Sequence, residues 1–263
     1  MEHEKVVVVG LGEIGKPLLR ILSRAYDTLG VDISEVELDW PCSILQICIP
    51  FELPNFLGIC AEYIAKYKPR YGVINSTVAP GTTRALEVHS GIPIAYSPVR
   101  GKHVRMEADM LRYKKFVGAA DESTVNAIVE HFERAGLATG RFRSPEAGEL
   151  AKLLETTWLG VLVSWAQEAE HIADLYDLSY DDVDSYIQEI DFLPRVSPGY
   201  IGGHCVMPNI AILRSLIQSS YLDEIVKSNN RKAERMETAG TPPERNVRAL
   251  AAIAHSARVG GNG

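Results

Sequence analysis

Paired cysteines, basic clusters and long apolar runs are all missing from this 263-residue sequence. Its four cysteines form no C-x-x-C pair, so neither a structural zinc site nor disulfides are expected, and metal ligands are predicted to be absent. The net charge of −7, without a basic cluster, argues against a nucleic-acid partner. No apolar run approaches the ~18 residues of a membrane-spanning helix, and the first residues lack a signal peptide's basic and apolar regions. These absences favour a reduced, cytoplasmic setting away from membranes.

The most informative stretch, residues 5–15, has four consecutive valines followed at once by glycines in the order G-x-G-x-x-G. A β-branched apolar run suits a strand buried on both faces of a parallel sheet, and residues 16–23 continue with helical periodicity. In such a unit Gly10 permits the tight turn, Gly12 lets a pyrophosphate come close, and Gly15 lets helix and strand pack closely. We therefore predict a dinucleotide site that includes the whole turn: Gly10, Leu11, Gly12, Glu13, Ile14 and Gly15.

An acidic residue ends the second predicted strand, residues 28–32. Asp32 stands about 20 residues after the glycines, where a carboxylate would accept hydrogen bonds from ribose hydroxyls. The same carboxylate would repel a 2′-phosphate, so NAD is predicted rather than NADP. Ile33 beside it, and Ile49 and Pro50 at the end of the third predicted strand, are further expected cofactor contacts. The alternative is a glycine turn in an α/β domain that binds no nucleotide.

Strand and helix patterns alternate as far as residue 144, which predicts an α/β fold with a doubly wound parallel sheet of the Rossmann type. From Pro145 to Tyr176 there is no internal proline, and apolar residues recur at helical spacing. A helix of roughly 30 residues, about 45 Å long, is expected there. It is apolar nearly all round, so we expect other helices of this chain or of a second subunit to cover it. The residues concerned are Trp158, Leu159, Leu162, Val163 and Trp165.

The predicted organisation has three parts. An NAD-binding domain over residues 1–144 is followed by an all-helical domain over 145–238, which closes the active site, and by a C-terminal tail over 239–263. The apolar circumference of the 145–176 helix also predicts a homodimer formed through that helix.

Polar side chains follow the fourth and fifth predicted strands. Ser76 and Thr77 would line a cleft beyond the strand ends, although serine and threonine also serve as turn and helix caps. Arg100, Lys102 and His103 come directly after a strand and could grip an anionic substrate. A solvated loop is the alternative for these three residues.

Two further segments carry candidate chemistry. A glycine-rich loop ends in His204-Cys205, where an adjacent base or cation could produce a thiolate, and Gly202 and Gly203 would let backbone approach a ligand. The alternative is a cysteine packed beneath the loop. Lys152, near the start of the long helix, could stabilise an alkoxide or carry a proton during hydride transfer. Alternatively, it is a solvated lysine paired with Glu149 or Glu155.

The order of these motifs resembles the UDP-glucose/GDP-mannose 6-dehydrogenase family over roughly residues 5–236. The matching segments are Gly10–Gly15, Ser76-Thr77-Val78 with Gly81-Thr82, Glu149-Leu150-Ala151-Lys152-Leu153, and Gly202-Gly203-His204-Cys205. The resemblance implies NAD as cofactor, a dimer through the long central helix, and two successive oxidations of a sugar C6 alcohol. In that chemistry the cysteine holds the aldehyde as a thiohemiacetal and then as a thioester. The candidate catalytic residues are Thr77, Lys152, Thr156, Cys205 and Asn209, and the candidate substrate contacts are Arg100, Lys102, His103, Lys152, Gly202, Gly203 and His204.

Three positions differ from the family pattern. Val99 stands where the family has a glutamate implicated in thioester hydrolysis, and Thr156 and Asn209 replace an asparagine and an aspartate. The chain is also expected to be a short member that lacks the C-terminal UDP-binding domain.

Three functions therefore remain open. The first is an NAD-dependent dehydrogenase of a sugar or sugar nucleotide, in which the missing glutamate favours a single two-electron step. The second is a β-hydroxyacid dehydrogenase that uses Lys152 without Cys205 and holds a carboxylate with Arg100 or Lys102. The third is a catalytically impaired NAD-binding partner or sensor. Retention of both Lys152 and Cys205 favours the first.

Overall fold

The computed structural model describes residues 4–32 and 42–241. The chain divides into two compact units, Met1–Lys152 and Leu153–Gly263, and the boundary falls inside the long helix α6 (Pro145–Asp174). The sequence predicted a boundary between residues 144 and 145, which is the point where α6 begins. Most of the predicted tail, residues 242–263, lies outside the described ranges.

Among the described residues, the first unit contains one seven-stranded sheet in the order β2-β1-β3-β4-β5-β6-β7. The strands are β1 (Lys5–Val9), β2 (Asp27–Val31), β3 (Ile44–Ile47), β4 (Tyr71–Ile74), β5 (Ile94–Tyr96), β6 (Lys115–Ala119) and β7 (Thr139–Arg141). Neighbouring strands are parallel except β5 and β6, which are antiparallel. The predicted doubly wound α/β fold is confirmed, and the antiparallel pair is a feature that the sequence patterns did not indicate.

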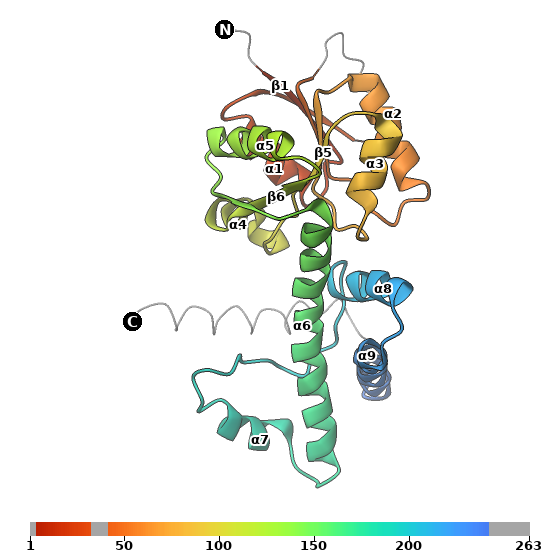
Figure 1. Ribbon diagram of the computed structural model, residues 1–263. Helices are drawn as coiled ribbons and strands as arrows, with labels where there is room; N and C mark the ends of the chain where they lie inside the picture. Colours follow the sequence, from red (N-terminus) through yellow and green to blue (C-terminus); the bar gives the residue numbers. More distant parts are fainter. Residues whose placement is uncertain (1–3, 33–41, 242–263) are drawn as a thin grey trace. The chain divides into compact units, whose positions relative to one another are not determined.

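Helices cover both faces of this sheet (Figure 1). Helices α1 (Gly15–Leu22), α4 (Met106–Arg112) and α5 (Glu122–Arg134) lie on one face, and α2 (Phe56–Tyr67) and α3 (Thr82–Ser90) lie on the other. The valines of β1 alternate between the two layers, because successive side chains of a strand point to opposite faces. Val6 and Val8 join the core that contains Phe132, whereas Val7 and Val9 join the core that contains Leu86. An uninterrupted valine run is therefore what this central strand requires.

The second unit is helical and is built on α6. It contains α7 (Tyr180–Ile187), α8 (Val206–Leu216) and α9 (Ser220–Thr238). Its core joins Val163 of α6 to Ile210 of α8 and Ile225 of α9. None of the helices in the described ranges is long and apolar enough to cross a membrane.

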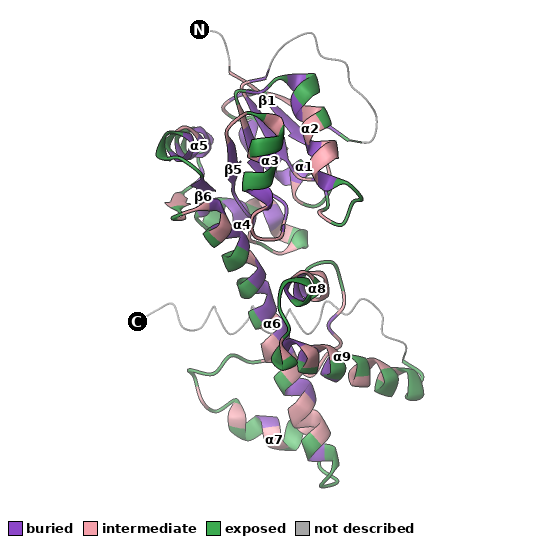
Figure 2. Ribbon diagram, turned by 45° about the vertical axis from the view of Figure 1, so that its right-hand side comes forward, coloured by how far each residue is buried: buried purple, intermediate pink, exposed green. Residues whose placement is uncertain are grey.

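The long helix is confirmed, but the described residues cover only part of its apolar circumference. Val163 is 1% exposed, whereas Trp158 and Trp165 are 59% and 66% exposed. Figure 2 shows the sheet largely buried, whereas buried, intermediate and exposed residues alternate along α6. Among the described residues, α8 and α9 pack on only part of the helix surface, and both tryptophans lie outside that part, so the predicted cover by a second subunit stays a prediction.

Candidate functional site

The glycine turn lies where the connections of the sheet change direction. The chain leaves β1 for β2 on one side, and β3 pairs with β1 on the other, so ligands are expected beyond the carboxyl ends of these strands. Gly10 has a φ of +87°, and a Cβ atom there would lie 2.8 Å from the Cys48 carbonyl carbon. A Cβ atom on Gly15 would lie 1.8 Å from the Gly10 carbonyl oxygen, whereas one on Gly12 would meet nothing within 4 Å. The fold thus requires glycine at positions 10 and 15, whereas Gly12 leaves open space at the turn.

The other predicted cofactor contacts surround this turn. Asp32 is exposed directly after β2, and Ile33 lies outside the described residues. Ile49 is buried beyond the end of β3, and its carbonyl oxygen accepts a 2.5 Å hydrogen bond from the Ser76 hydroxyl. Ser76 therefore ties the loop after β4 to the loop after β3. The half-buried Thr77 follows it, and the exposed Pro50 follows Ile49.

The predicted substrate loop folds against the cofactor turn and against its own neighbours. His103 forms an ion pair with Glu13, which belongs to the glycine turn. The Arg100 guanidinium lies 5.0 Å from the centre of the Phe116 ring. Lys102 donates its backbone N–H to Asp109, and burial lowers the pKa of its side chain. The structure thus brings His103 to the predicted cofactor turn, although both side chains of this pair stay largely exposed to solvent.

A buried polar network lies behind the ends of the central strands, and the sequence patterns did not reveal it. Lys115, which is 3% exposed, donates to the Asn75 side-chain oxygen at 2.8 Å and to the Ser97 carbonyl oxygen at 2.6 Å. Asn75 donates to Gln46, and Gln46 contacts the Nε2 atom of His131 at 3.1 Å. Only Gln46, a polar residue inside an apolar strand, gave a sequence signal for this network.

Two groups of this network have strongly shifted pKa values. Burial lowers the pKa of Lys115 to about 7, with Cys48 opposing the shift and the charge of Lys152 adding to it. Burial also lowers the pKa of His131 to about 3.

Glu149, which matches the first residue of the family's helix motif, connects α6 to α3. Its two carboxylate oxygens accept hydrogen bonds from Gly81 N at 2.6 Å, Thr83 N at 2.8 Å and the Thr83 hydroxyl at 2.6 Å. The carboxylate is fully buried, and burial raises its pKa. The Glu149 carboxylate therefore caps the N-terminus of α3 from α6, and Thr83, the second residue of α3, donates to it.

The remaining candidate residues belong to the second unit. Cys205 is exposed at the residue preceding α8, so it is not packed beneath its loop. Gly202 is half-buried, whereas Gly203 and His204 are exposed. Thr156 on α6 and Asn209 on α8 are buried, and Asn209 N donates to the Cys205 carbonyl oxygen at 3.2 Å. Within the described ranges, no three His, Cys, Asp or Glu side chains are grouped as a metal site.

The sequence of this chain is similar to that of a known dehydrogenase. No family model matches the chain. A UDP-N-acetyl-D-mannosamine dehydrogenase from Methanocaldococcus jannaschii is 25% identical over 77% of this chain; the chain spans 60% of that relative's length.

Two solved structures share the fold. A UDP-D-ManNAc dehydrogenase from Pyrococcus horikoshii has a TM-score of 0.77 at 18% identity and covers 96% of this chain and 81% of its own. A 3-hydroxyisobutyrate dehydrogenase from Mycobacterium tuberculosis has a TM-score of 0.68 at 14% identity and covers 97% and 99%. In sequence as well as in the order of its motifs, the chain resembles the UDP-glucose/GDP-mannose dehydrogenase family.

Proposed function

We propose that the protein is an NAD-dependent oxidoreductase that oxidises an alcohol or aldehyde carbon of a sugar or sugar nucleotide. The observation that carries the proposal is the glycine turn between β1 and α1, which lies at the switch point of the sheet and leaves open space at Gly12. The similarity to a UDP-N-acetyl-D-mannosamine dehydrogenase supports the substrate class.

The residues around this turn fit a dinucleotide. The N-terminus of α1 offers backbone N–H groups to phosphates, and the exposed Asp32 carboxylate is available to ribose hydroxyls. Asp32→Ala should therefore weaken NAD binding by about tenfold or more, since a charged hydrogen bond contributes roughly 1.5–3 kcal/mol. Asp27→Ala is the matched control, because Asp27 is exposed at the opposite end of the same strand. Equal NAD affinities of the two variants by calorimetry would exclude this role of Asp32.

Lys152 and Cys205 are the proposed reacting groups. Bound NAD would accept the hydride that leaves the substrate carbon. Lys152 would stabilise the alkoxide or take up the hydroxyl proton. The Cys205 thiolate would add reversibly to the resulting aldehyde, whose oxygen would take up a proton to give a thiohemiacetal. Breaking of the C–S bond would return the thiolate and release the aldehyde. The place of Cys205 before α8 suits this role, because a helix N-terminus stabilises negative charge on sulfur. With Val99 in place of a glutamate, we propose that the reaction stops after one two-electron step.

A second candidate is a β-hydroxyacid dehydrogenase that does not need Cys205. The observation in its favour is the 3-hydroxyisobutyrate dehydrogenase fold, which matches nearly the full length of both chains. Lys152 would then be the acid–base group, with Arg100 or Lys102 holding a carboxylate.

The deciding experiment follows NADH formation with a panel of UDP-, GDP- and TDP-sugars, hydroxyacids and simple sugars. Each active substrate is repeated with Cys205→Ala. One NADH per sugar-nucleotide molecule is the expected result, and the rate in the variant shows whether Cys205 takes part. Two NADH per molecule would instead indicate the complete family reaction despite Val99.

Other outcomes decide among the alternatives. Turnover of a hydroxyacid that survives Cys205→Ala would favour the second candidate. NAD binding without turnover of any substrate would favour an NAD-binding partner or sensor protein. Absence of NAD binding by calorimetry would refute the proposed function.

We also propose that the protein acts as a homodimer joined through α6. The exposed tryptophans Trp158 and Trp165 on this helix support the proposal.

A further inference from the structure

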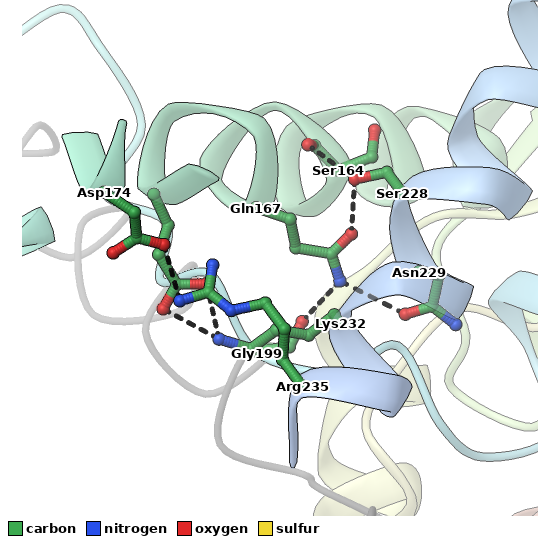
Figure 3. Close-up of polar contacts among 9 residues, drawn as sticks. Ser164, Gln167, Asp174, Gly199, Ser228, Asn229, Lys232 and Arg235 are labelled. Carbon is green, nitrogen blue, oxygen red and sulfur yellow. Dashed lines mark hydrogen bonds and ion pairs between the residues drawn. The ribbon is translucent and has the colours of Figure 1, made fainter. Parts of the chain in front are cut away.

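Two buried side-chain amides hold the segment that precedes Cys205. Figure 3 shows Gln167 of α6 and Asn229 of α9 pointing toward one another between the two helices. The segment 199–201 passes beside them and has no regular secondary structure of its own. We call Gln167 and Asn229 the amide clamp.

The clamp binds the backbone of this segment at two residues. Gln167 donates its amide N–H to the Gly199 carbonyl oxygen at 2.8 Å. Asn229 accepts from Ile201 N at 2.7 Å and donates to the Ile201 carbonyl oxygen at 3.1 Å. A single side chain thereby pairs with both backbone groups of Ile201, as a neighbouring strand would.

The two amides also support each other. Gln167 donates to the Asn229 side-chain oxygen at 3.1 Å and accepts from the Ser228 hydroxyl at 3.0 Å. Gln167 and Asn229 are 4% and 2% exposed, so truncating either one would leave buried polar atoms without partners.

Ion pairs between α6 and α9 fix the position of the clamp along both helices. Lys232, one helical turn beyond Asn229, donates to both carboxylate oxygens of Glu170 at 2.8 and 2.6 Å. Arg235 forms an ion pair with Asp174 at 2.5 Å. These pairs lie directly beside the amides in Figure 3.

The loop that carries Cys205 is therefore anchored on both sides. Before it, Ile201 is held by Asn229 and is itself 3% exposed in the core of the second unit. After it, Val206 begins α8 and is 1% exposed in the same core. Only residues 202–205 lie between these anchors, and the conformations open to so short a segment are few.

We propose that Gln167 and Asn229 are positioning residues that hold Cys205 at the N-terminus of α8 and so set the reactivity of its thiol. The catalytic part of this inference rests on the proposed function, whereas the effect on thiol reactivity does not. Loss of the clamp frees the 199–201 segment and lets the first turn of α8 fray.

The test compares Asn229→Ala with Asn230→Ala, because Asn230 is the adjacent residue on α9 and is exposed. Hydrogen exchange of the peptides covering residues 197–206 is measured by mass spectrometry. Alkylation of Cys205 by iodoacetamide is followed on the intact protein. Burial raises the pKa values of Cys42, Cys48 and Cys60 to about 12, so these thiols react slowly and the signal reports on Cys205.

We expect faster exchange in residues 197–206 of Asn229→Ala, and an alkylation rate at least about threefold lower, with the Asn230→Ala variant unchanged. With an active substrate, kcat should fall about tenfold or more while the KM for NAD stays the same, because small displacements of reacting groups are costly. Unchanged exchange and unchanged alkylation in Asn229→Ala would overturn the proposal.

A second variant covers the case in which Asn229→Ala loosens the whole unit. Gln167→Ala removes the bond to Gly199 and leaves both Asn229 bonds to Ile201, so a smaller change of the same sign is expected. No local change in this variant, with Asn229→Ala exchanging fast throughout the helical unit, would count against the clamp. Changed alkylation without dehydrogenase turnover would support the clamp and contradict the proposed function.

Discussion

The surroundings of Lys115 lower the pKa of its side chain. Its ammonium group is nearly inaccessible to water and donates to an amide oxygen and a backbone carbonyl oxygen rather than to a carboxylate. It also lies 4.9 Å from the centre of the Phe132 ring. Such neighbours replace only part of the hydration that a charged lysine loses, so burial favours the neutral amine.

This burial makes the stability of the protein depend on pH. The pKa of Lys115 is about 7 in the folded state and 10.5 in its ordinary range. Between these values the unfolded state holds a proton that the folded state has released, so stability rises with pH across this window. Lys115→Met should remove this rise and stabilise the protein most near the lower end of the window. Lys114→Met, which alters the exposed neighbouring lysine, should leave the rise intact.

Urea unfolding at several pH values between 7 and 9 measures the slope for both variants. This range avoids higher pH, where the buried cysteines with pKa values of about 12 act in the opposite direction. His131, with a pKa of about 3, causes a separate loss of stability as pH falls from 6.5 toward 3, and this loss should persist in Lys115→Met. An equal slope in the wild type and Lys115→Met would show that Lys115 keeps its charge.

At the scale of elements, Glu149 joins two helices through one carboxylate. It accepts three hydrogen bonds at the N-terminus of α3, from groups that would otherwise be buried without partners. Glu149→Ala should therefore destabilise the protein by about 2–4 kcal/mol, through unsatisfied N–H groups and a small cavity. The loss should appear in the first unit, which contains α3 and the cofactor turn.

Glu146→Ala is the matched control for this change. Glu146 lies one turn earlier on α6 and pairs with Arg84 of α3 in an exposed ion pair. Exposed pairs contribute only about 0–1 kcal/mol, so this variant should unfold close to the wild type. Thermal unfolding monitored by circular dichroism compares the two, and equal midpoints would contradict the proposed tie between α6 and α3.

The elements differed in how well the sequence predicted them. The valine strand, the glycine turn and the long helix follow from local patterns, because each fills its own layer or turn. Helix α4 was not predicted, because its seven residues are too few to show a clear helical periodicity of apolar side chains. The loop before it was interpreted only through its charged side chains. The partners of Lys115 and Glu149 come from distant strands and helices, and nothing in a local pattern states which residues will meet. The sequence left open whether this chain or a second subunit covers Trp158 for the same reason, because one helix does not specify how much of its surface its neighbours cover.

At the scale of the whole molecule, α6 presents an exposed apolar stripe. Leu150, Leu154, Trp158, Trp165 and Ile172 are 42%, 52%, 59%, 66% and 44% exposed. They are spaced by four, four, seven and seven residues, so they fall on one face of the helix. Spacing of this kind suits the packing of one helix against another, and in the proposed homodimer a second copy of the chain would supply the matching stripe.

We therefore expect Trp165→Asp to convert the homodimer into a monomer. Burying one tryptophan contributes about 2–3 kcal/mol, and the new carboxylate would be desolvated at the interface, so dissociation should increase by at least about a hundredfold. Val88→Asp is the control, because Val88 is 81% exposed on α3 and does not belong to the stripe. Light scattering at micromolar concentration reads the mass of all three proteins. A wild type that is already a monodisperse monomer would refute the dimer, whereas a dimer that survives Trp165→Asp would have to use a surface other than this stripe.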